Sequence, residues 1–274
     1  MKIKYSWVPF LIALSFLLPF GIYMGLSSAN GVAPSFLGTD GVFVSLVVMF
    51  FSLLSIFVIS HFSPDSIGGI VVHKNLFLSI SSILCGTAIF LDGIKHLFVG
   101  KSESFPGLLF VVLIIFAFIS GLSIAGFGVF LFGGKNFLDS FPYLGVLPAL
   151  WAFLRLYECN LKVKDDAGLT VEVYDILCFS LLAFFFFYQG KILANIGAGK
   201  SRSKELVMVY GMSSFLCSLF FLCDKIFKRV AENSFKVEDF FTFFTDASIL
   251  LYIIGFLIFL SFSRLNQLKF RDKF

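Results

Sequence analysis

The stretch GLLFVVLIIFAFISGLSIAGFGVFLF, residues 107–132, contains no charged side chain. A helix needs about 20 consecutive apolar residues to cross the hydrocarbon core of a bilayer. This stretch is longer than that, whereas a strand of an outer-membrane barrel has about 10 residues of alternating polarity. It therefore predicts a transmembrane helix, and the flanking sequence contains further runs of the same kind.

The composition of the whole chain agrees with lipid as its solvent. Hydrophobic residues make up 58% and charged residues 14% of the 274 residues, whereas soluble domains contain roughly 25% charged residues. We predict an all-α, polytopic membrane protein with about eight transmembrane helices. The candidate spans are residues 7–27, 41–60, 76–97, 107–132, 141–157, 174–190, 206–226 and 241–261. The fifth span is the weakest, because it is short and contains Pro148.

The first apolar run has two interpretations. Lys2 and Lys4 precede it, and the small residues at 27–29 resemble the cleavage site of a secretory signal peptide. The run reaches Leu26 and is longer than the usual apolar region of a signal peptide, which favours a retained helix.

The distribution of basic residues predicts the orientation. Two basic segments, 200–204 and 264–273, lie on the same side of the membrane as the N-terminus, and short basic segments face the cytoplasm. We expect a multi-pass protein of a bacterial plasma membrane with both termini cytoplasmic. The lipid bilayer is the expected partner, and the loop 191–204 and the tail 264–273 are candidate docking segments for a protein. The net charge of +4 suits anionic lipid and requires no nucleic acid.

A tandem duplication is indicated by the third and seventh spans. The segment SSILC at 81–85 recurs as SSFLC at 213–217, and Asp92 and Asp224 follow at equal distances. The same shift superimposes all the spans without a gap. We therefore expect two parallel four-helix halves related by a two-fold axis along the membrane normal, as in some transporters. These halves are residues 1–133 and residues 134–274.

The repeated segments carry a stripe of small residues. Small side chains four positions apart let helix backbones approach closely in lipid. The stripe consists of Ser81, Ser82, Cys85, Ser213, Ser214 and Cys217. Plain helix packing is one interpretation. The alternative is that the two halves of the stripe face each other and line a path that ends at Asp92 and Asp224.

Charged residues near the predicted outer ends of the spans are the candidate functional residues, because charge at membrane depth is costly. They are Asp92, Arg155, Asp175, Asp224 and Asp246. Arg155 shares a helix face with Trp151 and Glu158. It can pair with a carboxylate and close the outer end of the bundle, or extend to the interface beside Trp151. An acidic vestibule of this kind would attract cations.

No catalytic or metal-binding motif is present in the sequence. The chain contains no HxxxH, DxxxD, GxSxG or CxxC pattern, so we predict no metal and no cofactor, and an enzyme is the least favoured class. The favoured hypothesis is a transporter-like protein, or a membrane subunit of a transport system, for a small solute or cation. The alternative is a membrane-embedded sensor or assembly partner that neither transports nor catalyses.

Overall fold

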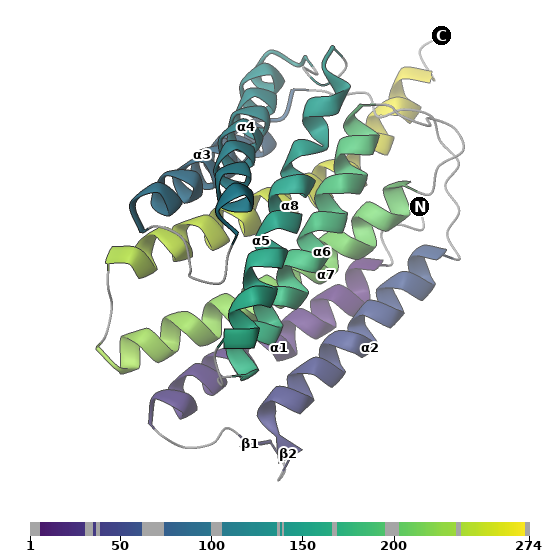
Figure 1. Ribbon diagram of the computed structural model, residues 1–274. Coiled ribbons are helices and arrows are strands. Elements are labelled where there is room, and N and C mark those ends of the chain that lie inside the picture. Colours follow the sequence, from purple (N-terminus) through teal and green to yellow (C-terminus); the bar gives the residue numbers. More distant parts are fainter. Residues whose placement is uncertain are drawn as a thin grey trace.

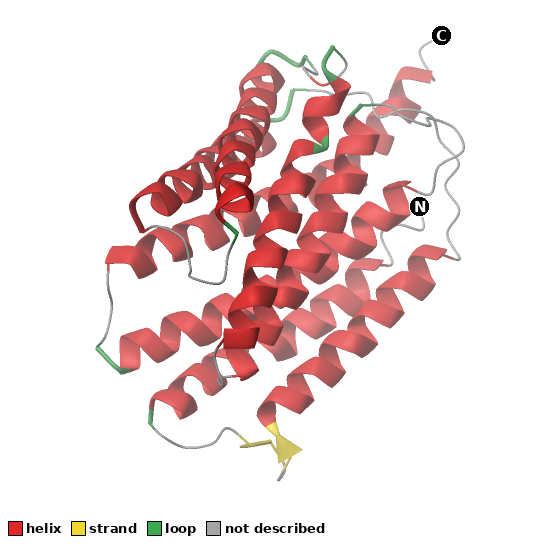
Figure 2. Ribbon diagram, in the orientation of Figure 1, coloured by secondary structure: helices red, strands yellow, loops and turns green. Residues whose placement is uncertain are grey.

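The computed structural model of the protein describes residues 6–30, 35–36, 39–61, 74–99, 106–135, 138, 140–165, 169–194, 203–233 and 237–271. In these residues the chain consists of helices joined by short turns and loops, with one short antiparallel pair of strands, β1 (Ser35–Phe36) and β2 (Thr39–Asp40), in which Ser35 pairs with Asp40 (Figure 2). The helices are α1 (Trp7–Ala29), α2 (Gly41–His61), α3 (Leu76–Val99), α4 (Gly107–Phe132), α5 (Leu147–Asp165), α6 (Leu169–Leu193), α7 (Ser203–Ala231) and α8 (Val237–Arg271), with the short 3-10 helix η3 (Pro142–Gly145) before α5 (Figure 1).

Helices α1 to α4 keep the predicted bounds to within two residues, whereas α6, α7 and α8 extend beyond their predicted spans at both ends, α8 by ten residues at its C-terminal end. The fifth helix differs in where it begins. The structure gives α4 the predicted limits, because its run ends at Gly133 and Gly134 on one side and begins after Pro106 on the other. The predicted start of the fifth span at residue 141 is wrong. Residues 142–145 form η3, and α5 begins at Leu147 so that Pro148, which lacks an N–H, occupies the first turn.

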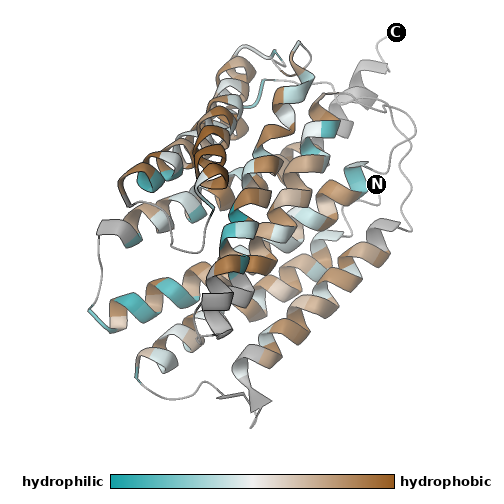
Figure 3. Ribbon diagram, viewed as in Figure 1, coloured by the Kyte–Doolittle hydropathy of each residue, from teal (hydrophilic) through white to brown (hydrophobic). Residues whose placement is uncertain are grey.

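Six helices of the described chain are long and apolar enough to cross a membrane. They are α1, α3, α4, most of α6, α7 and the 239–261 part of α8. In α2 the apolar core, Phe43–Val58, is shorter, and α5 does not qualify. The arrangement is consistent with a polytopic membrane protein, and Figure 3 shows how hydrophobic residues dominate most of these helices. The number of eight spans is not confirmed.

Helices α3 to α8 form a closed ring. Each packs against the next in the chain, and α8 packs back against α3. Helices α1 and α2 lie outside the ring, packed against each other and against α7 (Figure 1). At the end of the bundle that contains the start of α1, the indole Nε1 of Trp7 donates a hydrogen bond to Ser261 Oγ of α8 at 3.2 Å.

Close backbone contact joins α3 to α4. A Cβ atom on Gly86 would lie 2.5 Å from the carbonyl oxygen of Gly121, and one on Gly128 would lie 2.7 Å from the carbonyl oxygen of Ser79. Glycine is required at these crossings because any side chain would push the two helices apart. The glycines of α4 at these crossings therefore pack directly against α3.

The structure does not confirm the predicted pair of four-helix halves. A two-fold axis would give α3 and α7 equivalent neighbours. Instead α7 packs against α1, α2, α6 and α8, whereas the extensive contacts of α3 are with α4 and α8. The ring of α3–α8 crosses the predicted boundary between residues 133 and 134.

Candidate functional site

The charged residues predicted as candidates gather at one end of the ring. Asp92 lies in the C-terminal part of α3 and Lys225 in that of α7, whereas Asp175 and Asp246 lie near the starts of α6 and α8. These ends meet because neighbouring helices alternate in direction. The contact between α3 and α8 shows this directly, since Lys95 Nζ donates a hydrogen bond to Thr242 Oγ1 at 2.8 Å.

A buried ion cluster joins α3 to α5. We call it the α3–α5 ion cluster, and it consists of Asp92, His96, Arg155 and Glu158. Arg155 Nη1 donates to Glu158 Oε2, and Arg155 Nε lies 3.6 Å from Asp92 Oδ2. The indole of Trp151 donates to the same Asp92 oxygen at 3.3 Å. Trp151, Arg155 and Glu158 lie on one helix face. Trp151 and Arg155 therefore both reach Asp92 of α3, and Arg155 also pairs with Glu158.

His96 completes the cluster from one turn beyond Asp92. Its Nδ1 lies 2.8 Å from the backbone carbonyl oxygen of Asp92. Because a carbonyl only accepts hydrogen bonds, Nδ1 carries the proton. In the neutral ring Nε2 then accepts from Arg155 Nη1 at 2.9 Å. When the ring is protonated, Nε2 donates instead to Glu158 Oε2, 3.3 Å away.

The cluster is largely closed to solvent. The side chains of Asp92, His96 and Glu158 are at most 10% exposed and that of Arg155 is 17% exposed. The guanidinium also lies over the ring of Phe179 in α6, 5.3 Å from its centroid. Two carboxylates therefore share one guanidinium inside the bundle, and the loss of that charge would leave both of them buried without it.

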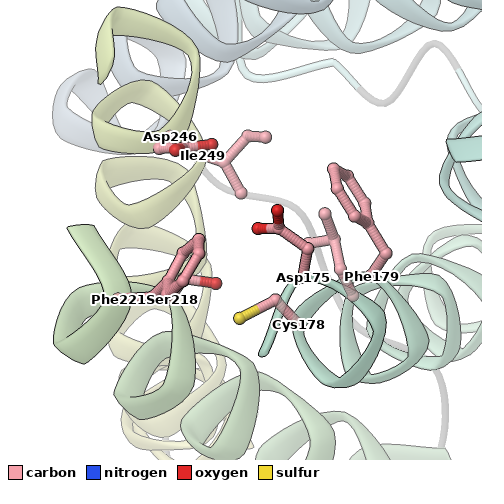
Figure 4. Close-up of a pocket in the computed structure, with 8 residues that line it drawn as sticks. Asp175, Cys178, Phe179, Ser218, Phe221, Asp246 and Ile249 are labelled. Atoms are coloured by element: carbon pink, nitrogen blue, oxygen red, sulfur yellow. The ribbon is translucent and has the colours of Figure 1, made fainter. Parts of the chain in front are cut away.

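A small cavity lies beside this cluster, between α6, α7 and α8. Its volume is about 30 Å³, room for about two water molecules. It is lined by Asp175, Cys178, Phe179, Leu182, Ser218, Phe221, Asp246 and Ile249. Figure 4 shows the carboxylates of Asp175 and Asp246 on opposite sides of this space, one from α6 and one from α8. Phe179 belongs both to the wall of the cavity and to the contact with Arg155, so the two sites adjoin.

One carboxylate of the cavity has a partner and the other does not. Lys225 Nζ of α7 lies 3.2 Å from Asp175 Oδ1 and 3.7 Å from the ring centroid of Phe221. Asp246 makes no hydrogen bond or ion pair within the part of the chain that the structure describes. It lies within electrostatic reach of Lys225 and Asp175, and also of Arg155 and Asp92. Asp246 is thus a carboxylate without a counter-charge of its own.

The stripe of small residues does not line this cavity. Ser81 and Ser82 donate hydrogen bonds to the carbonyl oxygen of Leu78, and Ser81 Oγ faces Gly255 of α8. On α7 the corresponding stripe faces α6, where Cys217 Sγ lies 2.9 Å from Cys178 Sγ.

The other residues of the stripe are also buried in the packing of the helices. Cys85 and Ser214 are fully buried, and Ser213 donates to the carbonyl oxygen of Val209. The two halves of the stripe meet different helices and do not face each other across a path.

Sequence reasoning missed two parts of the site. Lys225 was not a candidate, although a lysine inside a long apolar run is the kind of residue that needs a partner. His96 was not a candidate either, yet it is buried in the α3–α5 ion cluster. Asp224, which was a candidate, is half-buried on α7 and is not among the residues that line the cavity.

No group of three or more potential metal ligands occurs in the described ranges. Of the two segments predicted to dock a protein, residues 195–202 and 272–273 lie outside those ranges. Comparison with protein-family models, with curated proteins and with solved structures found no match.

Proposed function

We propose that the protein is a multi-pass membrane protein that moves a small cation across the bilayer, by itself or as a subunit of a transport system. The observation that carries the proposal is Asp246, an unpaired carboxylate that faces a cavity inside a ring of helices. An ionisable group at such a place is costly to keep, which makes it a functional candidate.

The cavity favours a cation over other small solutes. Its two carboxylates attract positive charge, and its volume of about 30 Å³ suits a solute of few atoms. The α3–α5 ion cluster adjoins it at the same end of the ring, where Arg155 is held between two carboxylates. We propose that this cluster closes one end of the route, which is one of the two roles that the sequence allowed for Arg155.

The orientation and the duplication belong to this proposal. With the basic segments 200–204 and 264–273 in the cytoplasm of a bacterial cell, the cavity lies toward the outer side of the plasma membrane. The two halves of the chain, residues 1–133 and 134–274, are then copies of one ancestral unit whose packing has diverged. The similar segments 81–85 and 213–217 support this duplication.

Flux into liposomes tests the proposal. The purified protein is reconstituted with a pH-sensitive dye inside, and gradients of sodium, potassium or ammonium chloride are imposed, with choline chloride to balance ionic strength. We expect flux of at least one of these cations or of protons above that of empty liposomes. Asp246→Asn should reduce it at least tenfold, because the isosteric amide removes the unpaired charge.

Asp239→Asn is the matched control. Asp239 lies on the same helix and pairs with Arg229 at 3.7 Å, in a contact in which Arg229 is 42% exposed. The same substitution there should leave the flux within about twofold of the parent, since exposed pairs contribute little. The proposal is wrong if the parent protein moves neither protons nor any of the three cations, or if Asp246→Asn transports as the parent does.

A further inference from the structure

Lys225 lies at the edge of the cavity and leaves its space open. Its ammonium group lies 3.2 Å from Asp175 Oδ1 and 3.7 Å from the ring centroid of Phe221. Both of these residues line the cavity, whereas Lys225 is not among the described residues that line it. The space between the carboxylates of Asp175 and Asp246 therefore stays free for a solute while Lys225 remains paired and charged (Figure 4).

The charges around Asp246 balance in pairs. The charged groups that act most strongly on its carboxylate are Lys225, Asp175, Arg155 and Asp92. Lys225 is the ion-pair partner of Asp175, and Arg155 lies 3.6 Å from Asp92, so each of these pairs adds no net charge. Within the described residues, Asp246 is thus the charge of the cavity that has no counter-charge, and one positive charge would make the set neutral.

Neither the neighbouring carboxylate of α7 nor solvent removes this balance. Asp224 interacts more strongly with Lys228 than with Lys225, so Lys225 serves Asp175 first. The side chains of Lys225 and Asp175 are 26% and 27% exposed. Solvent weakens the effect of such a pair on its surroundings, but most of each side chain lies inside the bundle, where charges act over longer distances than in water.

The balance of charge sets the valence of the cation that suits the cavity. A monovalent cation between Asp175 and Asp246 brings the net charge to zero, whereas a divalent cation leaves one positive charge uncompensated where charge is costly. Calcium also takes six to eight oxygen ligands, and magnesium demands near-ideal octahedral geometry. The side chains of the lining that carry oxygen are Asp175, Ser218 and Asp246, and Asp175 is already engaged by Lys225.

We propose that Lys225 makes the cavity selective for one compact monovalent cation over a divalent cation. Because the cavity is that of the proposed cation transport, this inference rests on that proposal. Lys225 neutralises Asp175 from the edge of the cavity, and one monovalent cation matches the remaining charge of Asp246. Lys225 keeps its proton throughout. It determines specificity through the charge of Asp175 and does not touch the cation.

Cation binding to the detergent-purified protein tests the selectivity. Chlorides of sodium, potassium, ammonium, calcium and magnesium are titrated in turn by isothermal calorimetry, with choline chloride to hold the ionic strength constant. We expect the parent to bind at least one of the monovalent cations more than about tenfold more tightly than calcium or magnesium. Lys225→Met leaves two carboxylates without a counter-charge, so calcium or magnesium should bind this variant more than about tenfold more tightly than the parent.

A charge rescue separates this electrostatic role from a structural one. Asp175→Asn leaves Lys225 charged and without its partner beside Asp246, so the monovalent cation should bind more than about tenfold more weakly. The double variant Asp175→Asn with Lys225→Met removes the pair as a unit and restores the single charge of Asp246. Monovalent binding should then recover to within about threefold of the parent. Lys228→Met, the matched control on the same helix, should bind as the parent does, because Lys228 is not among the groups that act most strongly on Asp246.

The outcomes decide the selectivity separately from transport. A parent that binds none of these cations, or that binds calcium or magnesium as tightly as the monovalent ones, overturns the selectivity. A Lys225→Met variant that keeps the preference of the parent does so as well. If Lys225→Met does not fold, the loss of binding in Asp175→Asn and its recovery in the double variant, which leaves neither partner unpaired, still decide. Selective binding without flux into liposomes refutes transport alone, whereas flux with an unchanged preference in Lys225→Met refutes the selectivity alone.

Discussion

Replacing Arg155 by methionine should destabilise the bundle more than any other single loss of a charged side chain in the described residues. Methionine keeps much of the length and the apolar packing but removes the guanidinium that Asp92 and Glu158 share. Both carboxylates are 8% exposed and would be left inside the ring without the guanidinium, with His96 as their remaining ionisable neighbour in the cluster. Breaking a buried ion pair in this way costs about 3–5 kcal/mol.

Trp151 provides the signal for this measurement. The chain has two tryptophans, so a Trp7→Phe background leaves the indole of Trp151, which donates to Asp92, as the sole fluorophore of its kind. The free energy of unfolding is measured by titrating the protein with sodium dodecyl sulfate in mixed micelles, with and without Arg155→Met. We expect a loss of about 3 kcal/mol or more from the unfolding free energy.

Arg229→Met is the control for the loss of an arginine. Its pair with Asp239 is 3.7 Å long and Arg229 is 42% exposed, so its removal should cost no more than about 0.5 kcal/mol. A loss below about 1 kcal/mol for Arg155→Met would refute the reasoning, because the cluster would then behave as a solvated surface pair.

Two further predictions concern the packing of the ring. A Cβ atom on Gly121 would lie 2.6 Å from the carbonyl oxygen of Gly86. The substitution Gly121→Ala should therefore lower the unfolding free energy by about 1–3 kcal/mol in the same titration. The control is Gly107→Ala, which should leave the unfolding free energy unchanged because a Cβ atom there would have nothing within 4 Å. The Sγ atoms of Cys178 and Cys217 are 2.9 Å apart. With the other cysteines replaced by alanine, a mild oxidant should therefore form a disulfide that links α6 to α7. A protein that is then cut at an engineered protease site between the two helices should run as one band on a non-reducing gel. Two separate bands would contradict the packing of α6 on α7.

The helices themselves were predictable to the extent that apolar runs are uninterrupted. The bounds of α4 were predicted correctly because residues 107–132 carry no charge and the turn residues Gly133 and Gly134 follow. The start of α5 was not, because residues 141–146 are as apolar as the helix that follows. Hydropathy does not distinguish a 3-10 turn from the first turn of a helix, and there the position of Pro148 decides.

The residues of the candidate site were largely predictable from the sequence, whereas the contacts between helices that pair them were not. The spacing of Trp151, Arg155 and Glu158 placed them on one helix face, and this is confirmed. The choice of Asp92 and His96 as their partners depends on how α3 lies relative to α5. The similar segments 81–85 and 213–217 favoured pairing Asp92 with Asp224, whereas the structure surrounds these residues with different neighbours.

The sequence by itself determined that this protein is helical, that lipid suits its surface, and that a few charged residues gather near one set of helix ends. These features depend on local composition and periodicity, which each segment carries alone. Only the tertiary structure decided that α3–α8 close into a ring and that Asp175 holds Lys225 while Asp246 faces the cavity unpaired. Those pairings are set by the rotation and crossing of helices far apart in the chain, where the close approach of α3 to α4 at their glycines fixes backbone positions that no single segment encodes.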